Sequence, residues 1–132
     1  MYYHTPKIHY DFMLNSSLTN LSINEEGSNI VVPSNSVTVL KSINLPIGFY
    51  IFEYNVQFEK KANGYRSIII NPTPSANQNT SLSVCSAGDE IPTRIQKVRM
   101  INVNSETTMN FYAMQKSGSD INVSYTIKAL KL

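Results

Sequence analysis

The segment from Phe49 to Glu59, FYIFEYNVQFE, constrains the fold more than any other part of the chain. Large apolar side chains occupy every second position: Tyr50, Phe52, Tyr54, Val56 and Phe58. Polar side chains lie between and after them: Glu53, Asn55, Gln57 and Glu59. Because successive side chains of a β-strand point to opposite faces of a sheet, this order predicts a long strand with one buried face and one hydrated face.

Similar alternation recurs along the whole chain. Strands are predicted over LTNLSIN (18–24), SVTVLKSI (36–43), 65–71, 82–87, 93–103, 107–115 and 121–132. Pro46 and Gly48 supply a turn before the long strand, and Asn63-Gly64 predicts a β-hairpin that returns through 65–71. Gly27 and Pro33 are expected in loops. Since no window of helical length shows a helical spacing, the predicted fold class is all-β.

The architecture follows from the number and spacing of these segments. About eight strands with turn residues between them indicate an antiparallel sandwich or barrel, and the long middle connections favour a jelly roll. An immunoglobulin domain would need a Cys…Trp…Cys pattern, whereas this chain has one cysteine and no tryptophan. A length of 132 residues fits one domain. The residues of 71–81 are those of a loop, which is either a binding loop or a solvated connection.

Charge and hydropathy exclude several classes of function. The formal net charge is +2 and no basic run exceeds Lys60-Lys61, so the dense basic stripe of a nucleic-acid-binding protein is absent. No apolar run approaches the ~20 residues of a membrane span. Cys85 is the single cysteine, which excludes an intrachain disulfide. The first residues lack the order of a signal peptide, so we expect synthesis in a cytoplasm or excision from a larger protein.

Residues that would support catalysis are few. The histidines are His4 and His9, and a catalytic triad would have to use one of them. Cys85 is interpreted as a small buried apolar residue, and Asp89-Glu90 as charges in a solvated turn. A metal site at His4, His9 and Asp11 matches no strong ligand spacing. We therefore predict no enzyme activity, no metal and no cofactor.

The C-terminal part carries a resemblance to a known family. The segments LPIGFYIFEYNVQFEKKANGYRSIII and TTMNFYAMQKSGSDINVSYTIKALKL resemble the trimeric head domains of bacteriophage tail fibres and receptor-binding proteins, which are jelly rolls of the tumour-necrosis-factor and complement type. The shared features are loose. They are the Pro46–Gly48 turn, the aromatic strand, Gly64-Tyr65-Arg66, the turn from Gln115 to Ser119 and a final alternating strand.

The resemblance implies a homotrimer in which the last strand lies near the three-fold axis. It covers about residues 36–132, the head domain. Segment 1–35, which includes the first strand, is expected to be a neck or an arm that docks to other virion proteins. The implied function is recognition of a host surface receptor, commonly a saccharide, by a virion protein made in the bacterial cytoplasm. Sugar-binding candidates are exposed aromatic, amide and guanidinium side chains. They are Tyr65, Arg66, Asn77, Gln78, Asn79, Tyr112 and Gln115.

Other interpretations of the same residues remain open. The chain could be a structural virion protein, such as a capsid decoration, fibre or baseplate component, without a receptor. It could be a bacterial surface or spore-coat head, or a monomeric carbohydrate-binding module, although the absence of tryptophan disfavours such a module. A glycan hydrolase would need two carboxylates brought together from separate strands or subunits.

Overall fold

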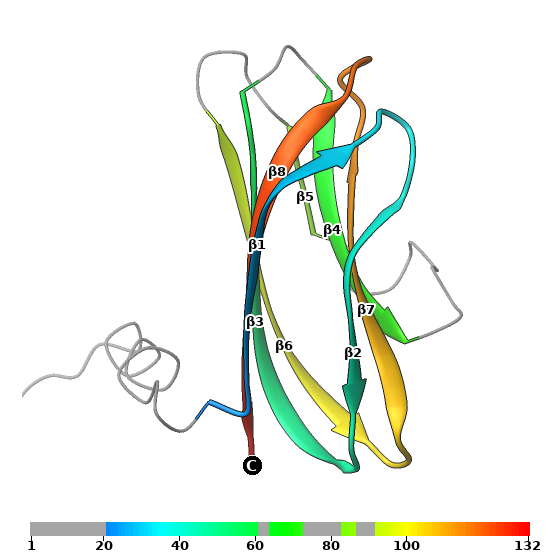
Figure 1. Cartoon of the computed structure of the whole chain (residues 1–132), viewed down its shortest axis with the longest axis vertical. Coiled ribbons are helices and arrows are strands. Elements are labelled where there is room, and N and C mark those ends of the chain that lie inside the picture. Colours follow the sequence, from blue (N-terminus) through cyan, green and yellow to red (C-terminus); the bar gives the residue numbers. More distant parts are fainter. Residues whose placement is uncertain (1–20, 61–63, 73–82, 87–91) are drawn as a thin grey trace, which may run out of the picture.

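The computed structural model describes residues 21–60, 64–72, 83–86 and 92–132. Its strands form two four-stranded antiparallel sheets that face each other (Figure 1). Sheet A has the order β1 (Ile23–Val32), β8 (Ile121–Lys131), β3 (Gly48–Phe58) and β6 (Thr93–Val103). Sheet B has the order β2 (Thr38–Leu45), β7 (Thr107–Gln115), β4 (Tyr65–Pro72) and β5 (Ser83–Ser86). The all-β prediction is confirmed, and this strand order is that of an eight-stranded jelly roll.

The last strand lies inside the fold, as the sequence predicts. β8 pairs with β1 on one side and with β3 on the other, so it is an interior strand of sheet A. Its alternate side chains from Ile121 to Ala129 are buried, whereas Leu132 at its end is 67% exposed. β8 therefore holds the first and third strands together and presents its other face outside the sandwich.

Two local predictions are wrong. β3 and β4 do not form a hairpin, because β3 belongs to sheet A and β4 to sheet B. Gly64 has a φ of +100° and lies against the backbone of Lys116. An added Cβ would collide with the Lys116 carbonyl oxygen, so this close approach requires glycine. Gly27 lies within β1 and not in a loop. The pairing of β1 with β8 shifts between Gly27 and Ile30, where Asn29 has a φ of +57°.

The core lies between the two sheets and is dominated by the predicted inner face of β3. Aromatic rings fill its centre: the ring of Phe111 on β7 lies 5.5 Å from that of Phe52 and 5.1 Å from that of Tyr54, centroid to centroid. The Tyr54 hydroxyl donates a hydrogen bond to the carbonyl oxygen of Tyr112 at 3.0 Å. Because this buried polar group has a partner, its burial is tolerated.

Two cations of β6 point inward at one edge of sheet A. Arg99 Nη1 donates a hydrogen bond to the carbonyl oxygen of Ile70 at 2.5 Å, which ties this edge to sheet B. Burial lowers the pKa of Arg99, and burial together with the nearby Arg99 charge lowers the pKa of Lys97. Inward-pointing charges on an edge strand oppose pairing with another sheet edge.

The described residues contain no helix long and apolar enough to cross a membrane. β1 already belongs to sheet A, so the sandwich includes residues 23–32 as well as the later strands. A boundary between an attachment arm and the head at residue 36 stays a prediction.

Candidate functional site

Most of the ligand-binding residues predicted from the sequence are placed on sheet B. Tyr65 begins β4 and is half-buried, with the Lys116 ammonium 5.1 Å from the centre of its ring. Arg66 and Gln115 pair across β4 and β7 and are both 0% exposed, and Tyr112 is 6% exposed. The structure thus brings Tyr65, Arg66 and Gln115 together, with Tyr112 farther along β7. Asn77, Gln78 and Asn79 lie outside the described residues. The binding role of this set stays a prediction.

Gln115 has a clear structural role within the chain. Its amide nitrogen donates hydrogen bonds to the carbonyl oxygens of Val32 at 2.9 Å and Ser119 at 2.6 Å. Its amide oxygen accepts one from the backbone N–H of Ser117 at 2.7 Å. The Gly118 N–H donates to the Ser34 hydroxyl at 2.9 Å. The turn that resembles the phage family is therefore fastened to the end of β1 through a buried amide.

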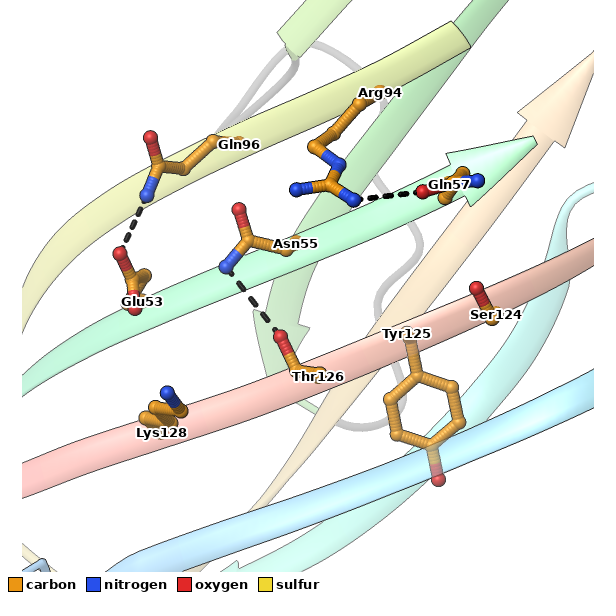
Figure 2. Close-up of a pocket in the computed structure, with 9 residues that line it drawn as sticks. All are labelled: Glu53, Asn55, Gln57, Arg94, Gln96, Ser124, Tyr125, Thr126 and Lys128. Carbon is orange, nitrogen blue, oxygen red and sulfur yellow. Dashed lines mark hydrogen bonds between the residues drawn. The ribbon is translucent and has the colours of Figure 1, made fainter. Parts of the chain in front are cut away.

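A groove of ≈ 380 Å³ runs across the outer face of sheet A, the face turned away from sheet B. It is lined from β3, β6 and β8, and Figure 2 shows its side chains. We refer to it as the polar groove. Its lining residues are Glu53, Asn55, Gln57, Arg94, Gln96, Ser124, Tyr125, Thr126 and Lys128.

Strand register aligns these side chains in rows. Asn55 of β3 lies between Gln96 of β6 and Thr126 of β8. Gln57 lies between Arg94 and Ser124 in the next row. Since side chains directly opposite each other on one face lie about 5 Å apart, each row presents three neighbouring polar groups. The alternation that buries the inner face of β3 places these groups outside.

Three hydrogen bonds orient the groove side chains (Figure 2). Arg94 Nη2 donates to the Gln57 amide oxygen at 2.7 Å, and Asn55 Nδ2 donates to the Thr126 hydroxyl at 3.4 Å. Gln96 Nε2 donates to a carboxylate oxygen of Glu53. Residues on adjacent strands thus fix one another, which reduces the rotamer freedom that a ligand would otherwise have to remove.

Charge in the groove is mixed and unevenly exposed. Glu53 is 7% exposed although it belongs to the outer face, and it accepts the hydrogen bond from Gln96. Arg94 is exposed at the edge strand β6. Lys128 is half-buried and pairs with Glu53 across β3 and β8. The cations therefore border the groove, while its carboxylate is largely withdrawn from solvent.

Tyr125 contributes a wall to the groove and no stacking surface. It is 7% exposed and belongs to the core face of β8. Its ring extends toward β1 (Figure 2), where Gly27 leaves room for it, because an added Cβ would collide with the ring. The groove therefore offers amides, hydroxyls and charges, with no exposed aromatic ring among its lining residues.

One acidic side chain lines the polar groove. Glu53 is the one carboxylate among the lining residues, whereas glycoside hydrolysis uses a pair of carboxylates. The described residues hold no group of three or more histidine, cysteine or acidic side chains that could bind a metal ion. His4, His9, Asp89 and Glu90 lie outside the described residues. Cys85 belongs to β5.

Next to the polar groove, the same face of sheet A becomes apolar. Met100, Ile51 and Leu130 form one row across β6, β3 and β8. Val98 lies beside Glu53, and the N–H of Leu132 donates a hydrogen bond to the carbonyl oxygen of Phe49 at 2.8 Å. We refer to this surface as the apolar end. It consists of Phe49, Ile51, Val98, Met100, Leu130 and Leu132.

Sequence reasoning predicted three of the nine lining residues as part of a hydrated strand face and did not predict the groove. It predicted a hydrated face of β3 with Glu53, Asn55 and Gln57, but did not propose that face as a site. The alternation within 93–103 and 121–132 carries the corresponding signal for Gln96 and Thr126. Which strands flank β3 is fixed by the topology, and no local pattern reveals it.

These observations define the class of the protein as an all-β sandwich with a polar groove on one sheet. No family model and no curated protein matches the sequence. Solved structures with a similar arrangement include a pilus of Bacillus endospore appendages, with a TM-score of 0.49 and 9% identity over 83% of this chain and 88% of that chain.

Two further solved structures cover most of this chain. A carbohydrate-binding module from a Cellvibrio mixtus lichenase, in complex with cellotriose, has a TM-score of 0.41 and 14% identity over 82% of this chain and 88% of its own. A capsid structure of a Helicobacter pylori bacteriophage has a TM-score of 0.37 and 8% identity over 82% of this chain and 94% of its own. All three scores are below 0.5, so these similarities carry no argument about function.

Proposed function

We propose that the chain is a non-enzymatic head domain of a phage or prophage virion and that its polar groove binds a saccharide of the host surface. The observation that carries the binding role is the array of polar side chains in register on three strands. Asn and Gln amides both donate and accept hydrogen bonds, as sugar hydroxyls do. A rigid sheet that presents several such groups in one groove can therefore match several hydroxyls at once.

The virion role is supported by the resemblance to trimeric phage heads. Two features of that resemblance have defined structural positions here. Gly64 permits the approach of β4 to the Lys116 carbonyl, and Gln115 fastens the turn before β8. Both residues have a structural role, and the recognition proposed here is placed on the exposed face of sheet A.

The apolar end supports self-association into a homotrimer. Its side chains include Met100 at 59%, Leu132 at 67% and Phe49 at 39% exposure. Val98 at 43% and Ile47, just before β3, at 63% are exposed as well, and exposed apolar side chains that gather on one face often mark a contact site. No charged side chain belongs to the apolar end, as expected for the centre of a contact between copies. Lys131, between Leu130 and Leu132 in sequence, does not interrupt the apolar end, because its ammonium lies 5.9 Å from the centre of the Tyr50 ring on the core face.

Binding of the full chain to a panel of purified bacterial envelope polysaccharides tests the receptor role. The key variant is Asn55→Ala/Gln57→Ala, which removes two amides from the groove. The matched control is Asn44→Ala/Asn104→Ala, which removes two exposed amides outside the polar groove and the apolar end. We expect binding of at least one polysaccharide by the wild type and the control, and a loss of about tenfold or more in the groove variant.

Two outcomes would contradict the proposal. Equal binding by the groove variant and the control would place recognition elsewhere on the molecule. No binding of any polysaccharide by the wild type would contradict the receptor role and favour a structural virion component. The mass of the wild type by light scattering tests the trimer separately, because a monomer at every concentration would contradict it.

A further inference from the structure

We infer that the polar groove selects an acidic saccharide, whose carboxylate is bound by Arg94. This inference rests on the proposed saccharide-binding function and names the class of sugar. It arises from the position of Arg94, from the withdrawal of Glu53, and from the absence of an aromatic stacking surface among the lining residues.

Arg94 is held at the rim of the groove in an orientation suited to an anion. One of its N–H groups donates to the Gln57 amide oxygen at 2.7 Å, which holds the guanidinium beside β3. Arg94 is exposed, and within the described part of the chain no ion pair involves it. A guanidinium has five N–H donors in a planar fork, so this single bond leaves a set of donors for a carboxylate.

Within the described residues, the carboxylates around the groove are engaged by other groups or lie outside it. Glu53 is 7% exposed and accepts the hydrogen bond of Gln96, and Lys128 is its cross-strand neighbour. Glu59, one row beyond Gln57, accepts a hydrogen bond from the backbone N–H of Asn122 at 2.8 Å. Glu26 is exposed on β1 beside Thr126 and does not line the groove. Arg94 therefore remains the exposed charge that lines the groove.

An acidic group also supplies affinity that this groove cannot gain by stacking. Sites for neutral ligands commonly rely on exposed apolar and aromatic side chains, and Tyr125 is buried against Gly27. Hydrogen bonds to a charged partner are roughly twice as strong as neutral ones. A bidentate contact from Arg94 to a sugar carboxylate, with the amides of Asn55 and Gln57 on adjacent hydroxyls, would use the groups that are present.

The test uses pairs of oligosaccharides that differ only in charge. The probes are oligomers of galacturonic acid, glucuronic acid and sialic acid, each with its carboxyl-reduced counterpart. They are measured against the full-length wild type, Arg94→Gln, Arg94→Lys and Lys116→Gln. The last variant removes an equal charge from a residue that does not line the groove.

We expect the wild type to bind at least one acidic oligomer about tenfold or more tightly than its reduced counterpart. Arg94→Gln should remove that preference, because it should weaken binding of the acidic oligomer more than binding of the reduced one. Arg94→Lys should restore part of it, since an ammonium cannot make the bidentate contact. Lys116→Gln should retain the wild-type preference.

The outcomes separate this inference from the proposed function. Equal affinity for acidic and reduced oligomers, or a preference that survives in Arg94→Gln, would overturn the inference while leaving saccharide binding intact. If no oligomer of either kind and no polysaccharide of the envelope panel binds the wild type, the proposed function fails as well. Thermal unfolding of each variant identifies a loss that is due to misfolding.

Discussion

The polar groove and the apolar end occupy the same three strands of the same sheet face. Both are built from β6, β3 and β8, with continuous antiparallel pairing from Phe49 to Phe58. They differ only in the residues that alternate outward. Three rows carry amides, hydroxyls and charges, with Val98 at the β6 edge of one of them. The remaining two rows carry large apolar groups, with Asn102 at the β6 edge of one of them. One backbone thus provides two surfaces, and the choice of side chain in each row decides which partner a surface can have.

The boundary between the two surfaces lies in one row. Glu53 is flanked there by Val98 on β6 and Lys128 on β8. Val98 is 43% exposed, whereas Glu53 is 7% exposed. A contact between copies at the apolar end would therefore place the edge of a partner beside the polar groove. Changes on either side of this row should separate self-association from saccharide binding.

The largest effect is expected from the core that supports both surfaces. Phe111→Ala removes the ring that packs against Phe52 and Tyr54, and the loss should be about 3–5 kcal/mol of unfolding free energy. Because Phe52 and Tyr54 lie on the inner face of β3, the groove and the apolar end should weaken together. Urea unfolding measures the loss. A stability change below about 1 kcal/mol would show that this aromatic cluster does not carry the core.

The next largest effect concerns the apolar end alone. Met100→Glu places a charge in the proposed contact, where burial of an unpaired carboxylate is costly. We expect the mass measured by light scattering to fall from three chains to one, with saccharide affinity per chain unchanged.

Ser119→Glu is the matched control for this change, because it adds the same charge at an exposed turn outside the apolar end. The control should remain a trimer. If the Met100→Glu variant remained a trimer, the contact between copies would have to lie on another surface. A control that dissociates as well would indicate a general charge effect.

Local sequence patterns were sufficient to predict most strands, but not which strands pair with one another. The bounds predicted for β6 and β7 agree with the structure. β6 alternates between buried and exposed residues, whereas β7 is a mostly buried strand bounded by turn residues. The prediction of a hairpin at Asn63-Gly64 was wrong because a tight turn and a close approach of two backbones both require a glycine with positive φ. The prediction that Gly27 lies in a loop was wrong because a β-bulge allows the strand to continue through this part of the chain.

The site was harder to predict because its residues are distant in sequence. Asn55 and Thr126 are separated by 71 positions, and Gln57 and Arg94 by 37. Pairing of this kind depends on how two sheets are assembled and leaves no local signal. Gln115 shows the opposite problem. A polar residue in a turn has the composition of a binding residue, yet its amide is fully buried and satisfied by backbone groups.

A smaller effect is expected from a change that makes one position apolar in the row next to the boundary between the apolar end and the polar groove. Thr126→Val keeps the shape of the side chain and removes the hydroxyl that accepts from Asn55. The variant removes one hydroxyl from the groove and releases the Asn55 amide. Loss of one hydrogen bond to the ligand, about 1 kcal/mol, should lower saccharide affinity about fivefold. The mass should stay that of three chains. Titration calorimetry with the best polysaccharide measures the affinity, and an unchanged value would mean that the ligand does not reach this row.

The smallest effect at neutral pH is expected on the inner face of the same rows. Tyr54 lies between Glu53 and Asn55 in sequence but points into the core. Tyr54→Phe removes its hydrogen bond to the Tyr112 carbonyl oxygen, at a cost of about 1 kcal/mol in unfolding free energy. Neither the mass nor the saccharide affinity should change, since both surfaces keep their side chains.

This difference between wild type and Tyr54→Phe should depend on pH. Burial, and secondarily Tyr125, raises the pKa of Tyr54 well above 10 in the folded state, whereas in the unfolded chain it is about 10. Below pH 10 both states keep the phenol protonated, and the full contribution is present. As the pH rises above 10, the unfolded chain loses this proton first, so the wild type loses stability that the variant does not lose, up to about 1.4 kcal/mol per pH unit. Urea unfolding at pH 7, 10 and 11 should show the two proteins converging, and a constant difference would mean that Tyr54 ionises alike in both states.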